Sequence, residues 1–123
     1  MKAVASLVFA GFLVAGAALA AAPVTVEGTL VDAACHLKDG ATTNDHGPMK
    51  SCGTMCLKGG TPAAVLTKDK KLHVIIAAAP ALADHVGSTV RVTGEANGNA
   101  ILAQKVQVNK GGKWEDVKIG MSM

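Results

Sequence analysis

Alternating apolar and polar residues recur in several segments of the chain after residue 23, and this pattern predicts β-strands. In a strand, neighbouring side chains point to opposite faces, so alternation with many β-branched residues indicates one buried face and one exposed face. The segment VTVEGTLVD, Val24–Asp32, shows the pattern most plainly. The further predicted strands span residues 63–67, 72–77, 88–96, 100–108 and 114–119.

Turn residues separate these strands. The sequence KDKK joins the second and third strands as a hairpin, and NGN and NKGGK contain the asparagines and glycines that are typical of turns. Residues 79–87 are rich in alanine and end on Gly87, which predicts a short helix. A short helix between the third and fourth strands of a five-stranded barrel is the arrangement of the OB-fold. We therefore predict a mainly β domain, a small OB-like antiparallel barrel; the alternative is an open antiparallel sheet with the helix on one face.

A polar, glycine-rich insertion, residues 32–60, follows the first strand and contains all three cysteines of the chain. The segment PMKSCGTMCLK in its second half is predicted to be helical, because Asn44 or Asp45 can cap it, Pro48 suits a first helical turn and two glycines follow the segment. In that helix Cys52 and Cys56 lie four residues apart on one face, and Met49 joins the same face. The insertion is therefore expected to present two thiols and a thioether on one side of a helix.

Cys35 lies in the sequence DAACH and is expected to approach this face from the end of the first strand. Three thiols and one imidazole form a tetrahedral Cys3His set that zinc commonly adopts, and sulfur ligands also suit Cu(I). His46 is preferred to His36 as the imidazole, because His36 follows Cys35 directly and adjacent residues rarely converge on one ion. The predicted ligands of a zinc or copper ion are Cys35, His46, Cys52 and Cys56, with Asp32, His36 and Met49 as additional candidates.

Two other interpretations of the cysteines stay open. A disulfide from Cys35 to Cys52 or Cys56 would stabilise the fold by about 3 kcal/mol and leave one free thiol. The protein would then be a disulfide-stapled binding or structural module without a metal. Alternatively, Cys52 could act as a redox thiol that Cys35 resolves, although no C-x-x-C motif is present. No catalytic residues are assigned, and a closed set of four ligands argues against catalysis.

The first 20 residues have the pattern of a secretory signal peptide. Lys2 precedes an apolar run, and Ala18-Leu19-Ala20 fits the small-x-small rule for cleavage. A membrane-spanning helix is the alternative, but alanine and glycine dominate the second half of the run. We predict a signal peptide at 1–20, a single domain at 21–123, a periplasmic or secreted location, and no stable membrane anchor after cleavage.

Composition excludes nucleic acid as an expected ligand. Without the predicted signal peptide the chain carries eleven Lys and Arg against nine Asp and Glu, a net charge too small to indicate a polyanionic partner. Binding of single strands needs aromatic or arginine platforms for base stacking, and after residue 20 the chain offers only Trp114 and Arg91. The expected partners are a metal ion and, as a further candidate, a periplasmic protein.

The combination GTLVDAAC, CGTMCLKGGTPAAVL and LADHVGSTVRVTGEA resembles a group of small exported bacterial proteins with OB-like barrels. The shared pattern is D-x-x-C at the end of the first strand, then C-x3-C, then a glycine-proline step into the next strand. In that group the acidic residue and the cysteines recur as a unit, which corresponds here to Asp32, Cys35, Cys52 and Cys56. Since most of its members have no characterised function, the resemblance implies a fold and the location of a site, and no reaction.

Overall fold

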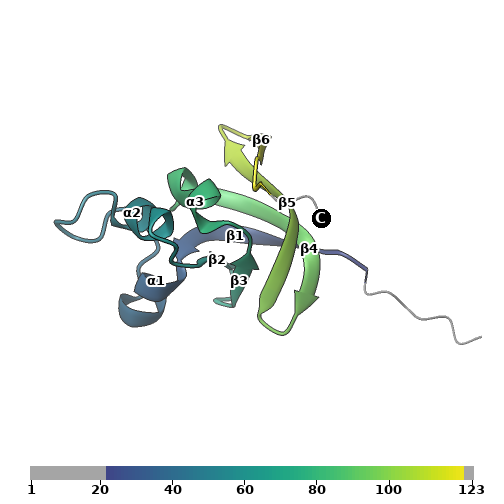
Figure 1. The fold of residues 1–123 in the computed structure, drawn as a ribbon, viewed down its shortest axis with the longest axis horizontal. Helices are drawn as coiled ribbons and strands as arrows, with labels where there is room; N and C mark the ends of the chain where they lie inside the picture. The colour runs from purple at the N-terminus through teal and green to yellow at the C-terminus, as the bar shows by residue number, and fades with distance from the viewer. Residues whose placement is uncertain (1–21, 121–123) are drawn as a thin grey trace, which may run out of the picture.

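The computed structural model describes residues 22–120, and its strands form one sheet that closes into a ring (Figure 1). The order across the sheet is β3-β2-β1-β4-β5-β6, and β3 also pairs with β5. The strands are β1 (Val24–Asp32), β2 (Ala63–Leu66), β3 (Leu72–Ile76), β4 (Thr89–Asn97), β5 (Ala100–Lys110) and β6 (Lys113–Val117). This arrangement confirms the predicted small barrel and excludes the open sheet.

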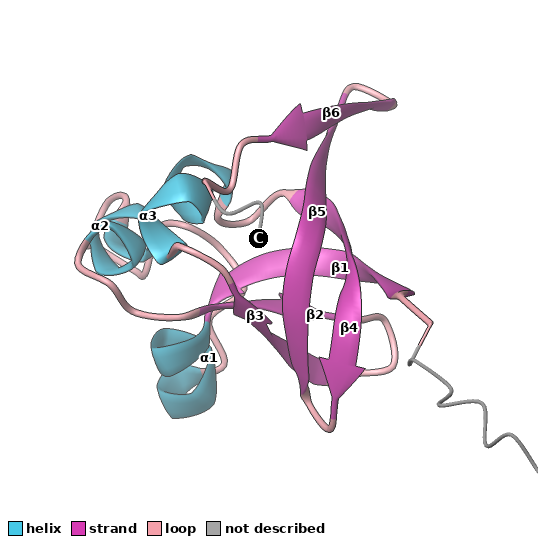
Figure 2. Cartoon of the chain, turned by 45° about the vertical axis from the view of Figure 1, so that its right-hand side comes forward, coloured by secondary structure: helices cyan, strands magenta, loops and turns pink. Residues whose placement is uncertain are grey.

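The ring closes where β3 meets β5. That pair is parallel, with Ile75 opposite Ile101, whereas every other strand pair is antiparallel. Strand β6 pairs only with β5 and extends beyond the ring (Figure 2). The register between β4 and β5 shifts at Gly94, where a Cβ would collide with the carbonyl oxygen of Leu102. A glycine at this position therefore allows the two strand backbones to approach closely as the sheet curves.

Aliphatic side chains fill the interior of the ring. Leu30, Val65, Val90 and Ile101 are fully buried in one cluster with side chains from all the barrel strands. Three short elements contribute further members of the cluster: α2 (Cys52–Lys58), α3 (Ala79–Leu82) and the 3-10 helix η1 (Ala83–His85). α2 packs against both α3 and η1, so the cysteine-bearing helix is anchored on the helix that joins β3 to β4.

A further helix, α1 (Ala33–Asp39), follows β1 without a break and was not predicted. The expectation that Cys35 lies at the end of the first strand was therefore wrong, because the strand ends at Asp32 and Cys35 lies in the first turn of α1. α1 ends at Gly40, which has a left-handed backbone with φ of 70°. A second, small apolar cluster of Val31, Ala33 and Ala64 lies at the base of α1.

No helix among residues 22–120 is both long and apolar enough to cross a membrane. The predicted signal peptide at 1–20 lies outside the described residues, and so does the proposed cleavage point.

Candidate metal centre

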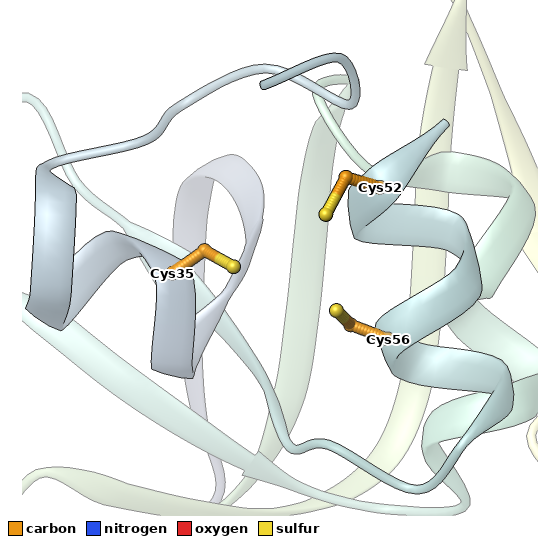
Figure 3. Close-up of side chains that lie close together, drawn as sticks. All are labelled: Cys35, Cys52 and Cys56. Atoms are coloured by element: carbon orange, nitrogen blue, oxygen red, sulfur yellow. The ribbon is translucent and has the colours of Figure 1, made fainter. Parts of the chain in front are cut away.

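Three thiols that lie apart in the sequence come together between α1 and α2. The sulfur atoms of Cys35, Cys52 and Cys56 all lie within 4.8 Å of one another. Figure 3 shows Cys35 on one helix and the other two cysteines, one turn apart, on the facing helix, with their side chains pointing toward a common point. None of the three forms a disulfide in the structure. The predicted convergence of the cysteines is confirmed.

Asp32 fixes the position of Cys35. It is the last residue of β1, and its Oδ1 accepts hydrogen bonds from the backbone N–H groups of Ala34, at 3.0 Å, and of Cys35, at 3.4 Å. An aspartate that accepts from the first free N–H groups of a helix is a favourable N-cap. Because the cap belongs to the barrel strand, Cys35 takes its position from the barrel.

The start of α2 is fixed by a loop residue. The backbone oxygen of Asn44 accepts from Gly53 N at 3.0 Å, and Asn44 Oδ1 accepts from Thr54 N at 2.8 Å. The Thr54 hydroxyl also donates to the carbonyl oxygen of Ala83 in η1, at 2.8 Å. These bonds satisfy N–H groups that have no partner within the helix, and they hold Cys52 and Cys56 against the barrel end.

The helix is four residues shorter at its start than predicted. It begins at Cys52 because Ser51 adopts a left-handed backbone with φ of 53°, which interrupts a helix. The preceding residues form a tight turn in which His46 and Met49 exchange backbone hydrogen bonds. Met49 is therefore not on the helical face that carries the thiols, and its side chain is 60% exposed.

The environment favours protonated thiols in the absence of a cation. The pKa of Cys56 is raised to about 12, mainly because the neighbouring Asp32 carboxylate interacts favourably with a neutral thiol and repels a thiolate. Burial of the thiol adds to this effect. Burial, followed by the same carboxylate, raises the pKa of Cys35. A bound cation would reverse this preference, since metal ions bind thiolates.

The histidines lie outside the close set of thiols. Each has one ring nitrogen directed at a carbonyl oxygen of its own loop: His36 Nδ1 lies 3.0 Å from Ala41 O, and His46 Nε2 lies 3.0 Å from Thr43 O. Neither belongs to the group whose ligand atoms are mutually within 4.8 Å, and neither does Asp32. The roles of His46, His36 and Met49 as metal ligands stay predictions.

The helix α1 was missed although two signals for it were present in the sequence. Asp32 is a favourable N-cap residue before AACHLKD, and Gly40 is a favourable residue after a helix end. Because the alternation of the preceding strand continues up to Asp32, the sequence pattern assigned Asp32 to the strand alone. The structure shows that Asp32 belongs to both elements at once.

The thiol set fits a soft or borderline metal ion. In a tetrahedral zinc site the Zn–S distance of about 2.3 Å places the sulfurs roughly 3.8 Å apart. Sulfur atoms that all lie within 4.8 Å of one another are close enough to bind one such ion. Comparisons of the chain with protein families, with curated proteins and with solved structures found no match. The group of three cysteines can hold a metal ion, and its function is inferred from this geometry.

Proposed function

We propose that the protein is an exported, non-catalytic metal-binding protein that holds zinc or copper through Cys35, Cys52 and Cys56. The observation that carries the proposal is the placement of three sulfur atoms within 4.8 Å of one another by two separate helices. Thiolates are the protein ligands that Cu(I) and Zn²⁺ share. The signal-like residues 1–20 support export.

The composition of the site supports a binding role over a hydrolytic one. Cysteine-rich sets are typical of structural zinc, whereas most catalytic zinc sites use histidine and carboxylate ligands and keep an open position. Among residues 22–120, no other group of three His, Cys, Asp or Glu side chains has ligand atoms this close together. A periplasmic protein that delivers or receives the ion is the corresponding candidate partner.

The proposal is tested by expressing the full chain in a bacterium, fractionating the cells, and purifying the protein without chelator. Elemental analysis and a thiol count are then made on the same sample. We expect the protein in the periplasmic or secreted fraction with one zinc or copper ion per chain. Cys56→Ser should abolish metal retention, whereas Met55→Leu should not, because Met55 is 69% exposed on the same helix.

A protein that retains no metal, with two cysteines oxidised and one free, would contradict the proposal and favour the disulfide-stapled module. Unchanged metal content in Cys56→Ser would also contradict it, because the ion would then bind elsewhere. A protein confined to the cytoplasm would contradict export alone.

A further inference from the structure

Asp32 is a buried acidic side chain with one oxygen unused. It is 2% exposed and is the single charged residue in the buried class among residues 22–120. Oδ1 accepts the two backbone hydrogen bonds that cap α1, whereas Oδ2 is buried and makes no hydrogen bond of normal length and angle within the described chain. No Lys, Arg or His of that part of the chain forms an ion pair with it.

Such an arrangement is costly in a protein without a ligand. Burying a carboxylate without a cation loses its hydration, and proteins normally compensate this loss with a paired charge or a metal ion. The carboxylate also lies close enough to Cys35 and Cys56 to disfavour their thiolate forms, so it adds to the negative charge that these residues acquire when they bind a metal. A cation at the thiol cluster would compensate the charges of the carboxylate and the thiolates together.

We propose that Asp32 Oδ2 is the fourth ligand of the site and that it makes the site selective for a divalent ion, Zn²⁺, over Cu(I). This inference rests on the proposed function and names the metal. A carboxylate oxygen is an established zinc ligand, whereas Cu(I) is selected by soft sulfur ligands. The added anionic ligand also gains more from a doubly charged ion than from a singly charged one.

The position of Asp32 suits this role better than the positions of the imidazoles. Its backbone belongs to β1 and its Oδ1 is bonded to α1, so the carboxylate is held where it acts on Cys35 and Cys56. His36 and His46 instead have a ring nitrogen directed at the carbonyl oxygens of Ala41 and Thr43. Because Asp32 is not in the group whose ligand atoms lie within 4.8 Å of one another, binding would require the carboxylate to move closer to the sulfurs.

The test compares the full-length parent protein with Asp32→Asn and Asp39→Asn, each purified, reduced and stripped of metal. Asparagine keeps the helix cap but is a poor metal ligand. Asp39→Asn is the matched control, because it removes the same charge from the exposed last residue of the same helix. Zinc and Cu(I) affinities are measured anaerobically by competition with chromophoric chelators of known affinity.

We expect Asp32→Asn to weaken zinc binding by at least about tenfold, the lower end of what the loss of a supporting group costs. Cu(I) affinity should fall by a smaller factor, and Asp39→Asn should change neither affinity. Equal losses for both metals, or unchanged zinc binding in Asp32→Asn, would overturn the inference while leaving the proposed function intact. A parent protein that binds neither metal would overturn both.

X-ray absorption of the zinc-loaded parent protein tests the same ligand without relying on a variant that must fold. Three sulfur neighbours and one oxygen neighbour are expected around the zinc. The multiple-scattering pattern of an imidazole, or a shell of sulfur alone, would overturn the assignment of Asp32.

Discussion

The barrel and the cysteine-bearing insertion of the same small domain are stabilised in different ways. In the barrel, Leu30, Val65 and Ile101 belong to a continuous cluster of fully buried aliphatic side chains. From Ala33 to Lys58, by contrast, Ala33, Cys52 and Leu57 are the only buried apolar side chains. The rest of the insertion is held by polar contacts, such as those of Asn44 and Asp32 with helix N–H groups.

This difference separates folding from metal binding. Burial of apolar area is the dominant source of stability in small domains, so the barrel can fold without the ion. A segment with few buried apolar contacts opens more readily than the core. The ion should therefore stabilise mainly the insertion, and its removal should leave the barrel folded.

The largest effect is expected from a core substitution in the barrel. Ile101 is fully buried and lies opposite Ile75 where β3 and β5 close the ring. Ile101→Ala should lower the free energy of unfolding by about 2–5 kcal/mol through lost burial and a residual cavity. Urea unfolding of the metal-free protein, followed by the fluorescence of Trp114 on β6, measures this loss.

Leu37→Ala is the control for that substitution, because Leu37 is 75% exposed on α1. It should change the free energy of unfolding by no more than about 0.5 kcal/mol. A loss below about 1 kcal/mol for Ile101→Ala would mean that the barrel does not dominate stability.

Removal of the ion should destabilise the cysteine-bearing insertion rather than the barrel. If zinc is present at 100 times its dissociation constant, adding chelator lowers the free energy of unfolding by about 2.7 kcal/mol. Hydrogen exchange should show loss of protection in α1 and α2, while the amides of β1 and β4 keep theirs. A uniform loss of protection over the barrel and the insertion would contradict the claim that the ion stabilises mainly the insertion.

The smallest effect concerns alkaline pH. Because the pKa of Cys56 is raised from 9.0 to about 12, folding favours its neutral thiol. This contribution to stability is fully present below pH 9 and is lost as the pH rises toward 12. Urea unfolding of the reduced, metal-free protein between pH 8 and 11 should show a decline that is shallower in Cys56→Ser. Identical slopes in the two proteins would show that Asp32 does not act on this thiol.

Much of the barrel could be predicted from sequence because its signals are local. The predicted first strand coincides with β1, and residues predicted as strand 100–108 lie within β5. Alternation and turn residues act over a few positions, so they are visible in one sequence. The helix predicted at 79–87 is likewise present, as α3 followed by η1.

The insertion was harder to predict because its elements depend on distant contacts. α2 is capped by Asn44, which lies ten residues before Thr54, and it starts after a left-handed Ser51. Asn44 was one of the two predicted caps, but the prediction placed the helix start at Pro48, because no local propensity reports a cap that acts across ten residues. The convergence of the three thiols was predicted, because a shared metal ion or a disulfide are the main reasons for three cysteines to occur in one short insertion. The preference for His46 over His36, which was based on the adjacency of His36 to Cys35, stays a prediction.

The double role of Asp32 ties the chemistry of the insertion to the alignment of a barrel strand. Asp32 is the last residue of β1 to pair with β2, opposite Ala63, and it is also the cap of the helix that carries Cys35. A slip of β1 by one residue would turn every side chain of that strand to the opposite face. Such a slip would carry the carboxylate and Cys35 away from the other two thiols. Substitutions in the sheet, remote from any cysteine, can thus abolish the site without altering one of its residues.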